Sequence, residues 1–371
     1  MNGRPHSAPS PADRQIKRRR VLAILEERGA DALVLRSTPA LAWYLDGARV
    51  QVSLVGDPVL AVVVTATEDV VLTFGNELDR LVAEELPDDI RTSAVEWHET
   101  LDPSTVAPGR VLPEADVADD LRRARAELLP TELARFRALG RDAAAAMTDA
   151  LSTLTPELTE RQAAARVGAE LLDRGMDPVV LLAAGRERLA HRHPLPTEAP
   201  LGDRAMLVVC ARRNGLILNA TRWIRFGAAR PDETEAADRL RRVEAAFLGA
   251  SRPGSTLADA FQAGIAAYGA NGFAAGEWRR HHQGGAAGYA GRDPRATPAT
   301  ADPIRLHQAF AWNPSAPLVK VEDTVVTTEH GVEVLSVDPR WPSSVVDGIP
   351  RPDELELERA GLGRRRKRGR P

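Results

Sequence analysis

Apolar residues recur at two different spacings along the first third of the chain. Val21 and Leu25 lie on one face at helical spacing, and Gly29 follows as a natural C-terminal cap, which predicts a helix. A strand-like stretch follows at 31–37, and residues 58–74 read as two strands separated by a turn at 67–69. A second helix is predicted at 77–87. We therefore predict an α/β domain with a mixed sheet.

Longer helices and hairpin-linked strands alternate in the remainder. Thr131 is a candidate N-cap for a long helix with one apolar face, and Thr159 is a candidate cap for a second helix that ends at Gly175. Further strand and helix patterns follow at 178–185, 204–227, 232–250, 256–272, 308–314 and 319–336. Because the strands are linked as hairpins, this block is predicted to be α+β with an antiparallel sheet.

The pattern divides the chain into four parts. We expect a disordered tail at 1–13, a smaller α/β domain at 14–126, a larger α+β domain at 127–345 and a basic tail at 346–371. The last part contains the basic run from Arg364 to Arg370, for which a solvated end is the simplest interpretation. Contact of this run with RNA or anionic lipid is the alternative.

Composition and charge exclude several classes of protein. The formal net charge is −3 and 43% of the 371 residues are hydrophobic, which argues against wholesale disorder and against a generally basic nucleic-acid binder. The single cysteine, Cys210, excludes an intrachain disulfide framework, and its apolar surroundings indicate an inert core thiol. No apolar run is long enough to span a bilayer. We expect a cytoplasmic protein with neither a membrane nor a specific nucleic-acid partner.

Several stretches follow one another along the chain: TELARFRALGRDAAAAM with TERQAAARVGAEL, HRHPLPTEAPLGD, GLILNATRWIRFG, HHQGGAAGY and VKVEDTVVTTEHGVEVL. In this order they resemble the creatinase, prolidase and aminopeptidase P family (peptidase M24). The resemblance runs from about 18 to about 337. It implies a creatinase-type N-terminal domain at 14–126, a pita-bread catalytic-type domain at 127–345, and a homodimer.

Members of this family with peptidase activity hold two divalent metals with five ligands, and the resemblance shows how far this chain departs from them. The five ligand positions are occupied here by Val208, Asn219, Gly285, Asn313 and Glu322. One carboxylate and two amides cannot neutralise a pair of divalent cations, so we expect no metal or other cofactor. Because adjacent strand residues face opposite sides, at most one of His281 and His282 is expected to face the site. A mononuclear metal on one histidine and Glu322 is the alternative.

Metal-free chemistry is implied by the resemblance to creatinase, where a histidine and glutamates move protons during C–N hydrolysis. The corresponding histidine position falls on His191, with His193 two residues further. An imidazole titrates close to neutral pH, and Glu322 could orient and polarise it. We favour His193, because Pro194 restricts it to an extended geometry, while His191 stays open. A loop histidine bonded to a backbone carbonyl is the structural alternative.

Polar and cationic residues near these positions indicate an anionic substrate group. An arginine fork binds carboxylate or phosphate, which suggests this role for Arg222 and Arg292. The alternative for Arg222 is an ion pair with Asp323, and the alternative for Arg292 is pairing with Asp293 or with solvent. The further substrate-binding candidates are Asn219, Asn313, His282, Gln283, Gly284, Gly285, Tyr289 and Trp312. The glycines permit close approach of backbone N–H groups to an anion, or an inter-strand turn. Core packing is the alternative for Tyr289. Trp312 is expected to form a pocket wall, with core packing as its alternative too.

Three functions are compatible with these observations. The first is a metal-independent enzyme that cleaves a C–N bond in a small-molecule or short-peptide substrate with an anionic group. The second is an inactive pseudo-peptidase that acts as a binding protein, and the third is a metallo-aminopeptidase or prolidase. Several buried amides and arginines favour the first function, because each costs about 1–3 kcal/mol if left unpaired.

Overall fold

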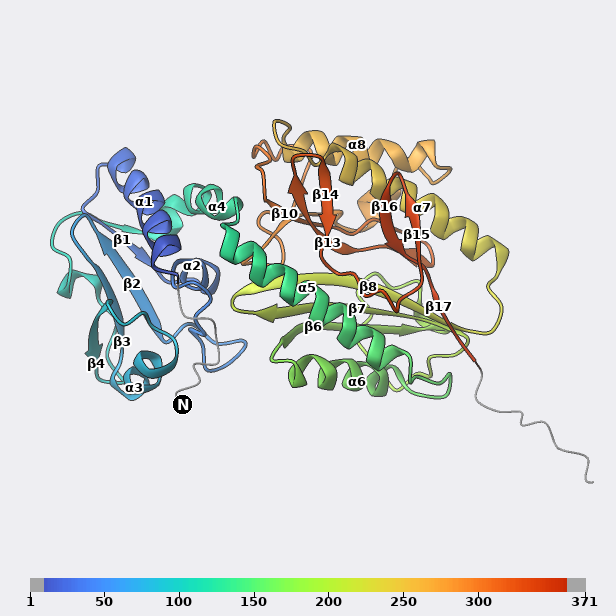
Figure 1. Ribbon diagram of the computed structural model, residues 1–371, viewed down its shortest axis with the longest axis horizontal. Coiled ribbons are helices and arrows are strands. Elements are labelled where there is room, and N and C mark those ends of the chain that lie inside the picture. The colour runs from blue at the N-terminus through green and yellow to red at the C-terminus, as the bar shows by residue number, and fades with distance from the viewer. Residues whose placement is uncertain (1–9, 359–371) are drawn as a thin grey trace, which may run out of the picture.

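The computed structural model describes residues 10–358, which form two units side by side (Figure 1). The smaller unit contains α1 (Pro11–Arg28), α2 (Thr38–Tyr44), α3 (Gly75–Glu84), α4 (Ala118–Ala126), the 3-10 helices η1 (Pro103–Thr105) and η2 (Glu114–Val117), and the strands β1 (Ala32–Leu35), β2 (Leu60–Thr65), β3 (Asp69–Phe74), β4 (Arg91–Val95) and β5 (Val111–Pro113). The strand order is β4-β3-β2-β1-β5, with parallel and antiparallel neighbours. The predicted mixed α/β sheet is therefore present.

The larger unit combines helix pairs with hairpin-linked sheets. Its helices are α5 (Pro130–Leu151), α6 (Glu160–Asp173), α7 (Pro231–Ala250), α8 (Leu257–Ala270), η3 (Arg186–Arg188) and η4 (Glu277–Arg280). Its strands are β6 (Asp177–Gly185), β7 (Arg204–Arg213), β8 (Leu216–Phe226), β9 (Gly284–Ala287), β10 (Ala309–Trp312), β11 (Ser315–Ala316), β12 (Val319–Lys320), β13 (Asp323–Thr328), β14 (Gly331–Val334), β15 (Ser343–Val346), β16 (Ile349–Pro352) and β17 (Leu355–Leu357). The antiparallel pairs of consecutive strands, β6 with β7, β7 with β8 and β13 with β14, confirm the α+β prediction.

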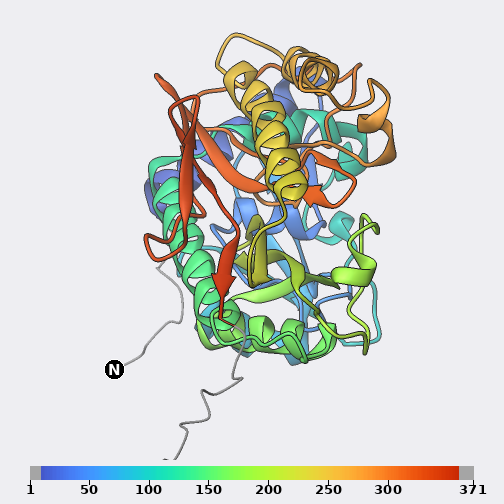
Figure 2. The same ribbon diagram turned by 90° about the vertical axis from the view of Figure 1, so that its right-hand side faces the viewer.

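Two four-stranded sheets, in the orders β17-β8-β7-β6 and β14-β13-β10-β9, form the centre of this unit. Helices α5 and α6 pack on the first sheet, and α7 and α8 pack on the second (Figures 1 and 2). The sheets meet where β8 runs beside the start of β13. There, Thr221 N donates to Glu322 O at 2.9 Å, and Asn219 N donates to Thr324 Oγ1 at 2.8 Å. This seam holds two of the five family ligand positions next to each other.

The helix boundaries follow the predicted caps with one exception. Gly29 adopts the left-handed conformation at the end of α1, and the Thr159 hydroxyl accepts from Gln162 N at the start of α6, as predicted. The prediction that Thr131 caps α5 is wrong, because the helix already begins at Pro130. Proline has no N–H to satisfy in the first turn, which makes it a natural first residue. The Thr131 hydroxyl instead bonds Asp13 across the two units.

A buried ionic cluster also joins the two units. Lys17 Nζ lies 2.8 Å from Asp46 Oδ1 and 2.8 Å from Glu132 Oε1, and all three side chains are fully buried. Arg135 Nη2 lies 2.6 Å from the same Asp46 oxygen. Lys17 comes from α1 and Asp46 lies two residues beyond α2, while Glu132 and Arg135 come from α5. The cluster therefore fixes the smaller unit against the larger one.

The segment expected to be a basic tail is partly ordered. Residues 349–357 form β16 and β17, and β17 pairs in parallel with β8. The 1% exposed Arg351 donates from Nε to Glu244 at 2.7 Å and from Nη2 to Asp323 at 2.8 Å. These buried ion pairs explain why the tail expected from 346 onward is wrong for this stretch. The basic run from Arg364 to Arg370 and most of the N-terminal tail lie outside the described residues. Between residues 10 and 358, no helix has both the length and the apolar character needed to cross a membrane.

Candidate functional site

Glu322 lies at the seam of the two sheets, where three side chains donate hydrogen bonds to its carboxylate. Lys320 Nζ lies 2.6 Å from Oε2, Arg292 Nη2 lies 2.6 Å from Oε1, and Thr221 Oγ1 donates to Oε2 at 3.0 Å. Burial raises the pKa of Glu322, but Lys320 and Arg292 outweigh it and hold the pKa at about 2. The carboxylate is therefore ionised at neutral pH and both of its oxygens are bonded to protein cations.

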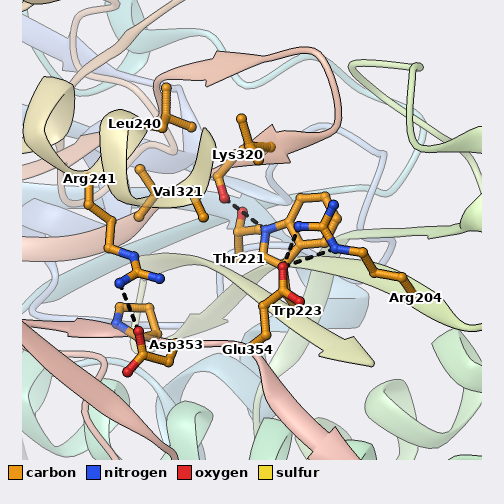
Figure 3. A pocket seen from close by; sticks show the side chains of 12 residues that line it. Arg204, Thr221, Trp223, Leu240, Arg241, Lys320, Val321, Asp353 and Glu354 are labelled. Atoms are coloured by element: carbon orange, nitrogen blue, oxygen red, sulfur yellow. Dashed lines mark hydrogen bonds and ion pairs between the residues drawn. The ribbon is translucent and has the colours of Figure 1, made fainter. Parts of the chain in front are cut away.

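The segment that carries Lys320 is anchored from its other side by Trp223. Trp223 Nε1 donates to Lys320 O at 2.8 Å, and the Arg204 guanidinium lies 4.2 Å from the indole ring centre. Figure 3 shows these side chains around a small cavity that Thr221 also lines. A volume of about 30 Å³ gives room for about one water molecule, so this cavity cannot hold a substrate. Its wall positions the backbone of the Lys320–Glu322 segment.

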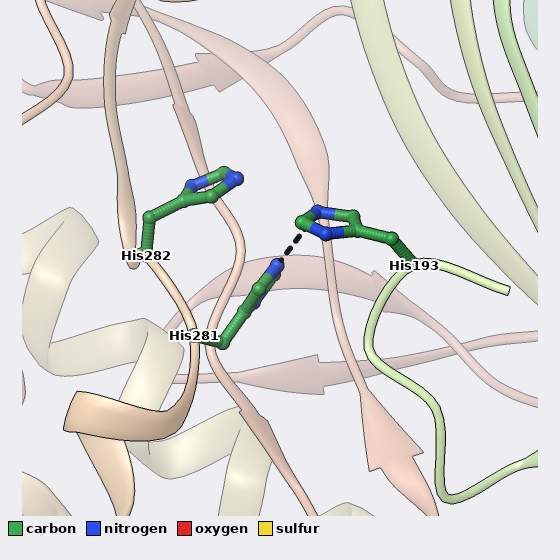
Figure 4. Close-up of side chains that lie close together, drawn as sticks. All are labelled: His193, His281 and His282. Atoms are coloured by element: carbon green, nitrogen blue, oxygen red, sulfur yellow. Dashed lines mark hydrogen bonds between the residues drawn. The ribbon is translucent and has the colours of Figure 1, made fainter.

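Three histidines gather beside this ionic group. His193 comes from the loop after η3, while His281 and His282 link η4 to β9, and the three rings face one another (Figure 4). The Nε2 atoms of His193 and His281 are 3.1 Å apart. One ring nitrogen from each histidine lies within 4.8 Å of the others. The expectation that only one of His281 and His282 faces the site is wrong, because the alternation of a regular strand does not apply to the link that precedes β9.

The surroundings keep these imidazoles neutral. Burial, followed by the charge of Lys320, lowers the pKa of His281 to about 2. Burial, followed by the charge of Arg292, lowers the pKa of His282 to about 4. The pKa of His193 is lowered by the same two effects, burial and Lys320, while Glu322 opposes them. All three rings therefore retain lone pairs at neutral pH.

His191 does not join the cluster. It is exposed and lines a small hollow whose wall also contains Leu189, Met206 and Lys320. His193, in contrast, joins the other two histidines, and the charges of Lys320, Glu322 and Arg292 act on its ring.

The residues at the five family ligand positions do not fit a dinuclear metal centre. Val208 contributes buried methyl groups, and Gly285 has no side chain. Asn219 Oδ1 accepts from Cys210 Sγ at 3.0 Å, and both oxygens of Glu322 are already bonded. Asn313 Oδ1 is buried without a hydrogen-bond partner among residues 10–358, but a neutral amide oxygen is a poor substitute for a bridging carboxylate. No arrangement of these groups neutralises two divalent cations.

Arg222 and Arg292 have different partners. The buried Arg222 donates from Nη1 to Asp323 at 2.8 Å and from Nη2 to Ser336 O at 2.5 Å, which is the structural ion pair given above as its alternative. The alternative for Arg292, pairing with Asp293, is wrong, because Asp293 pairs with Arg125 and Arg292 binds Glu322. Arg292 Nε is buried and has no partner within the described part of the chain.

Two aromatic candidates belong to the core. Trp312 is fully buried, stacks on Phe247 with ring centres 4.7 Å apart, and donates from Nε1 to Ser251 Oγ at 2.8 Å. The expected pocket wall is therefore wrong for Trp312, whose side chain points from β10 toward the α7–α8 layer. Tyr289 is also buried, and its hydroxyl donates to Glu132 Oε1 at 2.6 Å in the cluster between the units.

The remaining candidates serve the backbone around β9. The buried side chain of Gln283 accepts from Tyr268 Oη at 2.7 Å and donates to His281 O at 2.7 Å, so it holds the histidine link in place. A Cβ atom on Gly284 would lie 2.1 Å from Ala311 O, and one on Gly285 would lie 2.5 Å from Pro294 O. Close strand packing therefore accounts for both glycines without an anion.

Lys320 was missed by the sequence analysis. It stands two residues before Glu322, and residues at i and i+2 of an extended segment project to the same side. This spacing was the available signal.

Comparisons with known proteins bear on the fold of the chain. No curated protein matches the sequence. Among solved structures, dipeptidase PepE from Mycobacterium ulcerans superposes with a TM-score of 0.75 at 19% identity, over 95% of this chain and 100% of that one. The prolidase from Pyrococcus horikoshii OT3 gives 0.73 at 17% identity, over 87% and 99%. The N-terminal domain of the FACT complex subunit SPT16 from Cicer arietinum gives 0.62 at 13% identity, over 88% and 97%.

These likenesses confirm the fold expected from the sequence resemblance, a pita-bread domain preceded by a smaller domain. The family model described as metallopeptidase family M24 matches residues 134–329, which is more than half of the chain. This match establishes that the chain belongs to metallopeptidase family M24.

Proposed function

We propose that this chain is a hydrolase that cleaves a C–N bond in a small molecule or short peptide with an anionic group, and that it works without the dinuclear metal centre of its family. Family membership supports the hydrolase class. One observation supports the proposal that the chain works without the metal centre: both carboxylate oxygens of Glu322 are bonded by protein cations, Lys320 and Arg292.

The charge balance supports an anionic substrate. Lys320 and Arg292 together exceed the single negative charge of Glu322, so a divalent cation bound directly at the Glu322 carboxylate would meet net repulsion. An anionic group would meet net attraction and could bond the unpartnered Arg292 Nε. Buried polar atoms without partners call for an explanation, and a bound ligand supplies one.

His193 is placed to move protons in this reaction. Its neutral ring can accept a proton from an attacking water molecule while the water oxygen bonds to the substrate carbon. The same ring then returns the proton to the leaving nitrogen as the C–N bond breaks, so one water molecule is consumed and no net charge is created. His281 Nε2, 3.1 Å from His193 Nε2, orients the ring.

The unpartnered Asn313 Oδ1 gives the site an acceptor of its own. It is buried and free of hydrogen bonds within residues 10–358, so a substrate N–H can donate to it. A substrate that places an anionic group near Arg292 and an N–H group near Asn313 would resemble an amino acid or an amidine.

The decisive experiment is a hydrolysis screen on the purified chain, with N-acyl amino acids and dipeptides as substrates and a strong chelator present. We expect turnover that survives the chelator and does not rise with added Mn²⁺. Activity that requires two metal ions per chain would refute the proposal. A homodimer remains a prediction from the family resemblance, and light scattering on the same sample would check it.

A binding protein without turnover is the second candidate. One observation favours it: Glu322 is locked between two cations and is not free to act as a base. The similar fold of a FACT complex subunit, SPT16, supports this candidate only at the level of the fold. Saturable binding of an anionic ligand without any product would select this candidate over the hydrolase.

A further inference from the structure

The three rings of His193, His281 and His282 face a common point that the proposed reaction does not use as a whole (Figure 4). We propose that these three histidines form a mononuclear transition-metal site, separate from the five family ligand positions. None of the three residues occupies one of those positions, which hold Val208, Asn219, Gly285, Asn313 and Glu322.

The spacing of the nitrogens suits a metal ion. Metal–imidazole bonds of about 2.0–2.1 Å in a tetrahedral site place ligand nitrogens about 3.3 Å apart. The Nε2 atoms of His193 and His281 already lie 3.1 Å apart, and the complete set lies within 4.8 Å. A modest rotation of the His282 ring would therefore bring all three nitrogens to metal-binding distance of one ion.

The contacts around the cluster orient its rings. Ser315 Oγ lies 3.3 Å from His281 Nδ1, so Nε2 of that ring is directed to the cluster. A bond of this kind, to the nitrogen that does not bind metal, is what fixes most metal-binding imidazoles. His282 Nδ1 is buried and lacks a partner among residues 10–358, so this ring has no competing hydrogen bond at that atom.

The side chain of Gln283 helps to hold two of the three ligands close together. Gln283 Nε2 donates to His281 O at 2.7 Å and to Trp278 O at 2.9 Å, which ties the histidine link to η4. His193 comes from a loop 88 residues earlier, beside Pro194. A bound ion would therefore cross-link two distant segments at the edge of the site.

The ligand chemistry limits which ion is suitable. Neutral imidazoles favour Zn²⁺, Co²⁺, Ni²⁺ or Cu²⁺ over Mg²⁺ or Ca²⁺, which prefer oxygen. Three protein ligands leave a fourth tetrahedral position open. Because Lys320 and Arg292 lie near the cluster, an anion in that position would offset the charge of the ion.

Metal binding would have a consequence that depends on the proposed function. The ion would occupy the lone pair of His193 and prevent it from accepting a proton. If His193 moves protons as proposed, Zn²⁺ inhibits turnover, and a chelator restores it.

Cobalt provides the direct test, because tetrahedral Co²⁺ absorbs visible light. The full chain is stripped with chelator, titrated with Co²⁺, and its metal content is measured by equilibrium dialysis. We expect one Co²⁺ per chain, with affinity more than about tenfold weaker in His193→Ala and in His282→Ala. His191→Ala and Asn313→Ala are matched controls and are expected to bind as the wild type does.

Several outcomes would overturn the metal site: no Co²⁺ bound, two Co²⁺ per chain, or a loss of binding in Asn313→Ala that equals the loss in His282→Ala. His281 is only 8% exposed, so His281→Ala could fail to fold and is not needed for the decision. Circular dichroism of each variant separates loss of metal from loss of fold. Co²⁺ binding is measured without substrate, so its failure leaves the proposed hydrolase standing, and absence of turnover leaves the metal site standing.

Discussion

Lys320 Nζ lies 2.6 Å from Oε2 of Glu322, and both side chains are buried. The two residues project to the same side of an extended segment, so the backbone itself brings them together. Arg292 reaches the other carboxylate oxygen from the segment after β9. Both oxygens of this carboxylate are therefore paired with protein cations, at a seam whose fold is that of the family.

Replacing Glu322 by Gln should destabilise the protein strongly. Removal of the carboxylate leaves the ammonium of Lys320 and the guanidinium of Arg292 buried without compensation, which typically costs about 3–5 kcal/mol. The free energy of unfolding from urea titration would measure this. The double variant Glu322→Gln with Lys320→Met should recover part of the loss, because one uncompensated charge is then removed. Equal stability of the single and double variants would show that the pair is not coupled.

His193→Ala should lower kcat by about 10²–10⁴-fold, the usual contribution of a positioned acid or base, with little change in KM. His191→Ala is the matched control two residues away and should retain activity near that of the wild type. Steady-state kinetics on a substrate from the screen would measure both. Added imidazole should rescue His193→Ala if the ring moves protons. A larger effect of His191→Ala than of His193→Ala would contradict the assignment.

Asp46→Asn should weaken the junction between the two units. It should also make the free energy of unfolding depend less steeply on pH at acidic pH. Burial raises the pKa of Asp46, but Arg135 and Lys17 outweigh it, and the pKa is held well below its ordinary value. A depressed pKa contributes stability above about pH 4, and this stability is lost as the pH falls below that value.

Urea unfolding at several pH values would test this prediction. At neutral pH the Asp46→Asn variant should lose about 3 kcal/mol, and its stability should fall less steeply than that of the wild type below about pH 4. The exposed Asp57 supplies the control, and Asp57→Asn should follow the wild-type profile. Parallel profiles of Asp46→Asn and the wild type would show that Asp46 does not carry the acid dependence.

Gly284→Ala should disturb the pairing of β9 with β10. The new Cβ would lie 2.1 Å from Ala311 O, and the φ of +96° is disfavoured for residues with a side chain. We expect a loss of about 1–3 kcal/mol, measured by thermal unfolding. Gly249→Ala on α7 meets nothing within 4 Å and should be neutral or stabilising by up to about 1 kcal/mol. A neutral Gly284→Ala would restore the anion-binding interpretation of this glycine.

The local pattern of the sequence was sufficient for most elements. Gly29 and Thr159 mark helix ends through backbone conformation and side-chain capping, which depend on neighbouring residues only. The ordered strands near the C-terminus were missed because β17 is stabilised by pairing with the distant β8, and Arg351 by distant acids. Pairing between remote segments leaves little trace in a short window of sequence.

By itself, the sequence determined an α/β block followed by an α+β block, because periodicity is a local property. The replacement of the family's metal-binding carboxylates was implied by the resemblance to the family. Only the tertiary structure showed which groups the polar residues pair with. It assigned Arg222 to Asp323, Arg292 to Glu322 and Trp312 to the core. It also brought His193 beside His281 and His282 across 88 residues. Such choices depend on which distant groups share a buried space, since each desolvated charge or polar atom must find its partner there.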